Sequence, residues 1–458
     1  SISAGGSGKI RADNFVGQGV TTVIVGNCGR SHADIPAFAQ NLSKRKSNVN
    51  IATLVGLNAI RKKVMNESSN PASTAEIARM TEMVKAGMKA GALGVSTGLA
   101  YPTGIFASKA EIVAQLKVAK KFGGIHATHM RSEGGEIIKA VEDVIDYSQA
   151  ADIPLLISHY KITGLKNCNQ FDTLKKLIAQ ARAKGLKIYV DYYPYNASST
   201  SLNIFLPEWY LALDRKGKSK LLSTPVGRAK LKEGIREEVN HEGFHDLKFA
   251  KVAYYSPHRE WQGKSLDQID LLYRKVPSST MNTQLDTFVE MESRGGAQMI
   301  YHNICPDVLE RIPKEEENMI GTDSAIRYDN GESLPHPRGW GAFPRFIRYF
   351  VNEKKILSLD EAIYRMSGLP ATVFQLENRG RIKNNYYADL VIFDSKTISD
   401  GATYEDPFQP PVGIKYVLVN GKIVTRNEQA NNAHKVKHNS IILDVYPGVF
   451  IKKGSCAL

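Results

Sequence analysis

Two histidines lie at the ends of short apolar runs in the middle of the chain. The run over residues 124–130 carries His129 near its end, and the run over 154–159 ends at His159. A helical pattern follows each run. In a barrel of alternating strands and helices, reactive side chains lie at the carboxyl ends of the parallel strands. Two imidazoles delivered there by successive strands can bind one metal ion.

Two further polar residues end apolar runs elsewhere. Cys28 follows the β-branched run over 20–27, and Asp323 ends the run over 319–323. A catalytic zinc typically has three protein ligands and an open position for water or substrate. A carboxylate beside such an ion can accept a proton from the water and pass it to the leaving amine. The pattern predicts a hydrolytic zinc site with Cys28, His129 and His159 as ligands and Asp323 as the acid/base.

Each of these residues also has a less specific interpretation. A single histidine at a strand end is more often a satisfied packing residue than a metal ligand. A free cysteine is often a small buried hydrophobic residue, so Cys28 is the softest member of the set. Four such residues at four separate strand ends favour a site over four coincidences.

Other polar side chains follow the predicted strands. Arg131 and Glu133 lie beside His129, where they could support its orientation or form a plain solvated ion pair. Four residues could contact the amide or carboxylate of a substrate, although loop packing is the alternative: Tyr101, Lys161, Tyr193 and Ser199.

The alternation of strands and helices predicts a parallel α/β barrel rather than an open sheet. Residues 57–74 are polar and contain Pro71, so we expect a loop there. Residues 202–280 break the rhythm and are predicted to be an insertion. From residue 375 the pattern becomes alternating, and Asn420–Gly421 indicates a hairpin. The predicted organisation is a loop over 1–15, a barrel domain over 16–372, and a small β-domain with a tail over 373–458.

The composition excludes several classes of protein. The chain has 458 residues, a formal charge of +14, and 42% hydrophobic residues without a run that could span a bilayer. Its basic residues are spread along the chain without a nucleic-acid motif, so we expect the field to attract small anionic substrates instead. Its four cysteines lack paired short spacing and no secretory signal is evident, so we expect no disulfide framework and a cytoplasmic location.

The ordered motifs of this chain resemble the N-acyl-D-amino-acid deacylases, the D-aminoacylases of the amidohydrolase superfamily. The similarity runs from about residue 16 to about residue 425. The motifs that carry it are Gly26-Asn27-Cys28-Gly29, Ser96-Thr97-Gly98-Leu99, Thr128-His129-Met130-Arg131, Ser158-His159, Tyr193-Pro194-Tyr195, Gly321-Thr322-Asp323 and His336-Pro337-Arg338.

The resemblance implies a zinc-containing TIM-like barrel joined to a small β-sandwich. It implies hydrolysis of N-acyl-D-amino acids, small-molecule substrates, to a D-amino acid and a carboxylate. Cys28, His129 and His159 would hold the zinc, and Asp323 would be the general acid/base. The predicted substrate-binding positions are Tyr101, Lys161, Tyr193, Ser199 and Arg131.

Two departures from the family pattern lead to further expectations. The family begins its barrel with a strand that ends in a His-x-His pair, and that strand is not seen here; Leu57 also replaces a usual Gly-His. We therefore expect a barrel that lacks its first strand and a second, weaker metal site without its main ligands. The alternatives are a hydantoinase-like cyclic-amide hydrolase, although no lysine ends a strand where its carboxylated lysine belongs, or an inactive relative that binds a ligand.

Overall fold

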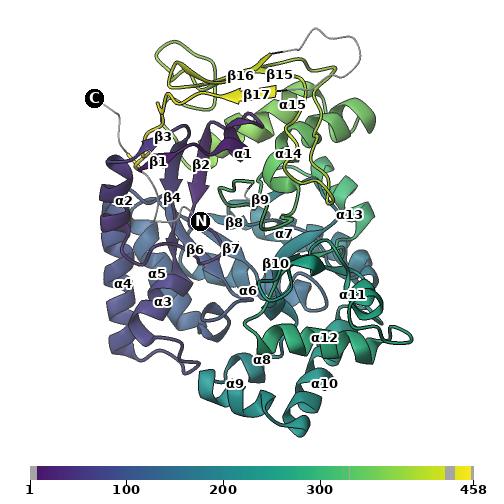
Figure 1. Cartoon of the computed structure of the whole chain (residues 1–458). Helices are drawn as coiled ribbons and strands as arrows, with labels where there is room; N and C mark the ends of the chain where they lie inside the picture. Colours follow the sequence, from purple (N-terminus) through teal and green to yellow (C-terminus); the bar gives the residue numbers. More distant parts are fainter. Residues whose placement is uncertain (1–7, 330, 429–438, 455–458) are drawn as a thin grey trace, which may run out of the picture.

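A parallel sheet surrounded by helices forms the centre of the molecule (Figure 1). The structure, a computed structural model, describes residues 8–329, 331–428 and 439–454. The strands follow the order β13-β9-β8-β7-β6-β5. Their bounds are β5 Val55–Gly56, β6 Gly94–Gly98, β7 Ile125–His129, β8 Leu155–Ile157, β9 Ile188–Tyr192 and β13 Asn318–Ile320. This confirms the predicted α/β architecture with a parallel sheet.

A second parallel pair continues the sheet beyond β5. β2 (Thr22–Val25) pairs with β4 (Asn50–Thr53), which leads directly into β5. The amide of Leu93 donates to the carbonyl of Thr53 at 2.9 Å, just before β6 begins. The strands therefore form an arc from β2 to β13, and in the described residues β2 and β13 are not paired with each other.

Helices follow the strands and cover the outside of the arc. They are α3 Leu57–Met65, α4 Thr74–Lys89, α5 Lys109–Lys121, α6 Ile137–Ala150 and α7 Phe171–Ala183. Ser73 and Glu76 form a capping box at the start of α4, in which each side chain accepts a hydrogen bond from a backbone amide. The loop expected over 57–74 was wrong for its first half. Leu57 and Ile60 lie one turn apart and are fully buried. A helix stabilises this segment more than a loop would, because it packs both apolar side chains against the core.

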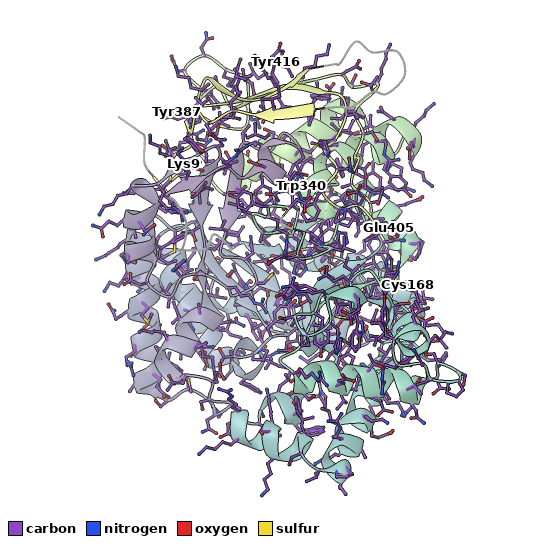
Figure 2. All side chains as sticks on the ribbon, in the orientation of Figure 1. Lys9, Cys168, Trp340, Tyr387, Glu405 and Tyr416 are labelled. Atoms are coloured by element: carbon purple, nitrogen blue, oxygen red, sulfur yellow. A yellow bond between two sulfur atoms is a disulfide. The ribbon has the colours of Figure 1, made fainter. Side chains whose placement is uncertain are left out.

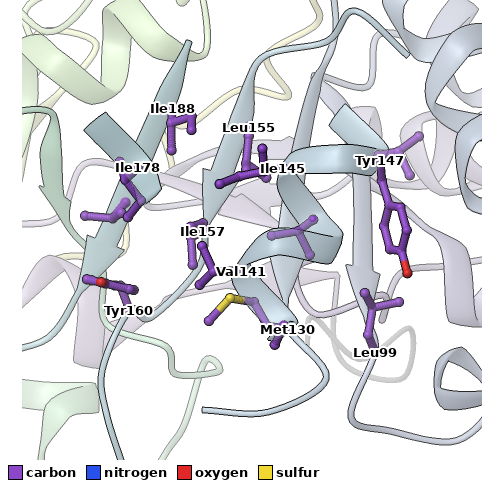
Figure 3. Packing of buried hydrophobic residues seen from close by; sticks show 14 of the residues in the cluster. Leu99, Met130, Val141, Ile145, Tyr147, Leu155, Ile157, Tyr160, Ile178 and Ile188 are labelled. Carbon is purple, nitrogen blue, oxygen red and sulfur yellow. The ribbon is translucent and has the colours of Figure 1, made fainter. Parts of the chain in front are cut away.

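The main core lies between the sheet and these helices. Leu155 and Ile157 of β8 face Val141 and Ile145 of α6, with Ile178 of α7 beside them (Figure 3). Side chains of one strand alternate between the two faces of the sheet, so the outward positions of β8 meet the apolar stripe of α6. This packing fixes the height at which each strand ends, and hence the positions of the residues that follow.

A separate unit follows β9. Its antiparallel sheet has the order β10-β12-β11 and its own apolar cluster, which includes Phe205, Leu231 and Phe288. Its elements are β10 Ser198–Ser201, α8 Glu208–Leu211, α9 Arg215–Leu222, α10 Pro225–His241, β11 Ala250–Tyr254, α11 Leu266–Leu272, α12 Met281–Ser293 and β12 Gln298–Tyr301. The partners of β12 show that it belongs to this unit rather than to the parallel sheet.

The chain then returns to the parallel sheet and ends in an antiparallel sheet. The helices are α13 Pro306–Arg311, α14 Arg338–Phe346, α15 Leu359–Ile363 and α16 Leu369–Val373, and the final sheet is β14 Leu390–Phe393, β15 Ile414–Val419, β16 Lys422–Glu428 and β17 Asn439–Ile442. Asn420 and Gly421 have φ values of 47° and 77°, as the predicted two-residue hairpin requires. Tyr416 of β15 lies at the outer end of the molecule (Figure 2).

The N-terminal segment packs between these two parts. Its elements are β1 Lys9–Ile10, α1 Asp13–Val16, α2 Ile35–Ser43 and β3 Lys46–Ser47. Ile10 and Phe15 share an apolar cluster with Val417 and Val424 of the final sheet. None of the helices in the described residues combines the length and the apolar character needed to cross a membrane.

The sequence led us to expect no disulfide framework, and in the described residues one pair of cysteines is bonded. Cys168, labelled in Figure 2, forms a disulfide with Cys305, whereas Cys28 is free and Cys456 lies outside the described residues. The two cysteines are 137 residues apart, so their spacing in the chain gave no sign of the pair. They meet because the loop after β8 lies against the segment that follows β12.

The disulfide leads to a direct prediction. Proteolysis of denatured, alkylated but unreduced protein should release a Cys168–Cys305 cross-linked peptide, which mass spectrometry detects. Reduction before alkylation should remove it. Recovery of both residues as alkylated peptides without reduction would contradict the pairing.

A buried ion pair inside the helical layer leads to a second prediction, which concerns the stability of the fold. Arg61 and Glu111 are both fully buried, 3.2 Å apart, and Arg61 also donates to the carbonyls of Ser68 and Asn70. Replacing Arg61 with Met should therefore lower the free energy of unfolding by about 3–5 kcal/mol, because it leaves a buried carboxylate without its cation. Urea denaturation followed by circular dichroism measures this change.

The neighbouring residue provides a matched control. Lys62 pairs with Glu67 at 2.7 Å, but both side chains are mostly exposed. Lys62→Met should change the free energy of unfolding by less than about 1 kcal/mol, since exposed pairs contribute little. Equal effects of the two substitutions would show that burial of the Arg61 pair does not matter.

Candidate metal centre and active site

The four residues predicted to form the site leave the parallel sheet at one edge. Cys28 follows β2, His129 is the last residue of β7, His159 follows β8 and Asp323 follows β13. All four strands are parallel, so their carboxyl ends lie on the same side of the arc. The four side chains line one cavity of about 950 Å³.

The backbone turns sharply at three of these positions. Cys28, His159 and Asp323 have φ values of 53°, 41° and 44°, in the left-handed region that non-glycine residues rarely adopt. Such conformations cost free energy and concentrate at functional sites. Gly98 permits one of the turns, because a Cβ atom there would lie 2.2 Å from the carbonyl oxygen of Cys28.

The donor atoms of the predicted ligands converge. The Sγ atom of Cys28 and ring nitrogens of His129 and His159 all lie within 4.8 Å of one another. The Nε2 atom of His159 is 2.8 Å from Nδ1 of His129 and 3.4 Å from Sγ of Cys28. The Nε2 atom of His129 is buried and has no hydrogen-bond partner among the described residues. One thiolate and two imidazoles match the ligand types of zinc, so the residues fit such an ion.

The far side of the His159 ring contacts a buried ion pair. Its Nδ1 atom lies 2.8 Å from Oε1 of Glu133, which also accepts from Nζ of Lys161 at 2.5 Å. The backbone amide of His159 donates to Oδ1 of Asp191 at 2.8 Å. A hydrogen bond from Nδ1 to the carboxylate leaves the lone pair on Nε2, which faces Cys28 and His129.

The charges of the site follow from burial and from these neighbours. Burial lowers the pKa of His129 to about 3, so its ring is neutral and can bind a cation. Burial alone would raise the pKa of Glu133, but Lys161 and His159 hold it well below its usual value. Glu133 is therefore a carboxylate at neutral pH. Burial raises the pKa of Asp191 to about 6.

Asp323 pairs with an arginine across the cavity. Its Oδ2 atom is 2.8 Å from Nη1 of Arg338, and its side chain keeps about 30% exposure. Burial would raise the pKa of Asp323, but Arg338, together with His159 and Lys161, lowers it below the usual value. Asp323 is thus ionised at neutral pH and faces the cavity, as a general base must.

Four of the predicted substrate-binding residues line the same cavity: Tyr101, Lys161, Tyr193 and Ser199. The ring of Tyr101 is 4.5 Å from that of His129, and its hydroxyl lies 3.1 Å from Oγ1 of Thr200. The ring of Tyr193 lies under the guanidinium of Arg338 at 4.4 Å. The sequence position of these residues therefore brings them to the site, although their substrate contacts stay a prediction.

The predicted pair between Arg131 and Glu133 was wrong. Arg131 donates to the carbonyls of Ile105 and Ala107 at 2.6 and 2.7 Å, while Glu133 pairs with Lys161. The side chains diverge because residue 131 points to the loop after β6 and residue 133 points to the loop after β8. Arg131 lines the cavity, but its guanidinium is occupied by the backbone.

Two residues of the site were not assigned a role from the sequence. Arg338 belongs to a motif that only the resemblance singled out, and it lies 15 positions after the carboxylate that it contacts. Asp191 lies near the end of β9, and its place after an apolar run was a usable signal, because the other site residues also lie at strand ends.

Comparisons with known proteins agree with this geometry. Residues 319–425 match the amidohydrolase family. A D-aminoacylase from Alcaligenes xylosoxydans xylosoxydans is 31% identical over 442 residues, which cover 92% of this chain and 81% of that protein. An N-acyl-D-glutamate deacylase from the same organism is also 31% identical, over 88% of this chain and 77% of its own length.

A solved structure shares the fold over almost the whole chain. The N-acyl-D-glutamate deacylase from Bordetella bronchiseptica, complexed with zinc and a phosphonate inhibitor that mimics the tetrahedral intermediate, has a TM-score of 0.77 and 28% identity. The match covers 96% of this chain and 84% of that structure. The chain thus belongs to the D-aminoacylase family of metal-dependent amidohydrolases.

Proposed function

We propose that this protein hydrolyses the acyl amide of N-acyl-D-amino acids with zinc as its cofactor. The observation that carries the proposal is the convergence of Cys28, His129 and His159 within 4.8 Å, in a cavity that also holds the carboxylate of Asp323. Relatives named for this activity, and one solved with zinc, support it.

The chain divides the chemistry among these residues. Zinc, when held by Cys28, His129 and His159, supplies Lewis-acid polarisation of the acyl carbonyl and makes water more acidic. Asp323, ionised beside Arg338, accepts the proton of the attacking water and returns it to the leaving amine. Glu133 keeps the Nε2 atom of His159 turned to the ligand cluster.

The cavity wall beside Asp323 carries a cation that can bind the α-carboxylate of the substrate. Arg338 is the cation nearest to Asp323, and Tyr193 lies against it. The α-carboxylate of an N-acyl-amino acid is only one carbon from the amine that Asp323 protonates. We therefore place that carboxylate near Arg338, with Tyr101, Lys161 and Ser199 orienting the acyl amide.

The arc of strands supports the proposal that the fold is a TIM-like (β/α) barrel. Parallel strands from β2 to β13, each leading to an outer helix or loop, match the greater part of a (β/α) barrel with its site at the carboxyl edge. In the described residues β2 and β13 each pair with one strand only, so the arc is open between them.

The hydantoinase-like alternative has weaker support. It needs a lysine between the metal ligands, whereas Lys161 contacts the Nδ1 side of His159 and pairs with Glu133. The thiol of Cys28 lies on the Nε2 side instead. A linear-amide hydrolase therefore fits the arrangement better.

The proposed role of Asp323 as the general base predicts the effect of replacing it. Asp323→Asn should lower kcat for N-acetyl-D-methionine by about 10²–10⁴-fold, the usual loss for a general base, while bound zinc stays near one equivalent per chain. Steady-state kinetics and metal analysis measure the two quantities. Asp329→Asn, an exposed position in the same segment, serves as the control.

Two outcomes would count against the proposal. Unchanged turnover in Asp323→Asn would reject the role of this carboxylate. Wild-type protein that binds no zinc and hydrolyses neither N-acetyl-D-methionine nor its L-enantiomer would favour the inactive, ligand-binding relative.

The contact between Glu133 and the ring of His159 predicts the effect of a second substitution on zinc affinity. Glu133→Gln removes the carboxylate that fixes the ring, so zinc affinity should fall about 10- to 100-fold. Competition with a chromogenic chelator measures the dissociation constant. Glu136→Gln, three residues later with a largely exposed side chain, should leave it unchanged. Equal affinities of all three proteins would exclude a positioning role for Glu133.

A further inference from the structure

One arginine of the cavity has no partner for its guanidinium among the described residues. Most cations that line the cavity are balanced: Lys161 by Glu133, Lys139 by Asp143 and Arg338 by Asp323. Arg131 is bound to backbone carbonyls. Among the described residues, the guanidinium of Arg327 has neither an ion pair nor a hydrogen bond, although it lines the cavity.

The backbone holds Arg327 in place. The buried side chain of Asn14 accepts from the amide of Arg327 at 3.3 Å and donates to the carbonyl of Ala325 at 3.0 Å. Between these two bonds, Ile326 packs into the apolar cluster of the N-terminal segment. Ile326 and Arg327 both line the cavity. These contacts fix the backbone that carries Arg327, and its exposed guanidinium stays open to an anion in the cavity.

The charges around Arg327 are of one sign. Burial and the nearby Arg338 both lower the pKa of Arg327, and no carboxylate offsets them. Two guanidinium groups close together in the cavity wall repel each other, and an anion bound between them offsets this repulsion. An arginine fork is suited to binding a carboxylate through two parallel hydrogen bonds.

Apart from Asp323, which pairs with Arg338, the acidic residues of the cavity lie on other elements. Glu208 and Glu238 belong to α8 and α10, and Glu242 follows α10 and accepts from the amide of Gly135 and the hydroxyl of Thr163. The cavity thus has an acidic wall on the inserted unit and a basic wall formed by Arg327 and Arg338. A substrate with several carboxylates would bind with them towards the basic wall.

Arg30 also lines the cavity without an ion pair among the described residues, but its guanidinium has a partner of another kind. Its guanidinium lies 4.8 Å from the centre of the Tyr101 ring, a cation–π contact. It follows Cys28 by two residues and belongs to the loop after β2. Arg30 therefore has a structural explanation that Arg327 lacks.

We propose that Arg327 determines specificity by binding the side-chain carboxylate of acidic N-acyl-D-amino acids, the derivatives of D-glutamate and D-aspartate. The proposal rests on the proposed function, in which Arg338 lies near the α-carboxylate. Arg327 is the next cation along the wall, further from Asp323, where the second carboxylate of such a substrate would lie.

The test compares two substrates of nearly equal shape, N-acetyl-D-glutamate and N-acetyl-D-glutamine. Wild-type protein should hydrolyse the acid with a kcat/KM at least about 10-fold higher, because only the acid pairs with Arg327. Arg327→Met should lower kcat/KM for the acid about 10- to 100-fold, mainly through KM, and change that for the amide less than about 3-fold. Arg327→Lys should retain part of the preference, which a loss of folding could not explain.

Arg30→Met is the matched control, and it should leave the preference for the acid unchanged. A wild-type preference for the amide, equal losses with both substrates in Arg327→Met, or loss of the preference in Arg30→Met instead would each overturn the assignment. Hydrolysis of N-acetyl-D-methionine distinguishes the two levels of failure. If it proceeds without a preference for the acid, only the specificity inference fails; if no N-acyl-D-amino acid is hydrolysed, the proposed function fails and the inference with it.

Discussion

The imidazole of His159 is held from both sides of its ring, and the arrangement of the cavity depends on this constraint. Glu133 accepts from Nδ1 and is itself held by Lys161, so Nε2 must face Cys28 and His129. Lys161 and Glu133 are almost completely buried, and a buried charge without its partner is costly. The ion pair between them therefore stabilises one orientation of the His159 ring that open solvent would not enforce.

The loops that carry this network are fastened to one another. The amide of Thr163 donates to the carbonyl of Glu133 at 2.7 Å, which ties the loop after β8 to the loop after β7. Glu242 reaches both loops from the inserted unit, and the bond between Cys168 and Cys305 joins the same loop to the segment after β12. Side chains at strand exits gain precision when several elements fix their loops, because positional freedom at the site weakens binding and catalysis.

The inserted unit also shapes the cavity. Its antiparallel sheet carries Ser199 and Thr200, and Thr200 contacts the hydroxyl of Tyr101. Its helices contribute the acidic wall, opposite in charge to the segment that carries Arg338. The parallel sheet thus supplies the ligand cluster, while the inserted unit and the segment after β13 supply the surroundings of the substrate.

The sequence by itself determined the elements and the residues at their ends. Apolar runs followed by helical patterns predicted the parallel strands, and Cys28, His129, His159 and Asp323 stood out because each ended such a run. The structure brings them together since parallel strands share one carboxyl edge. The capping box at Ser73 and the hairpin at Asn420 were readable for the same reason, because both depend on residues a few positions apart. Only the tertiary structure decided the partners across long separations: Arg338 with Asp323, Glu133 with Lys161 rather than Arg131, Arg61 with Glu111, and Cys168 with Cys305. These pairs form where loops of distant strands meet. The order of residues along the chain does not indicate which loops become neighbours.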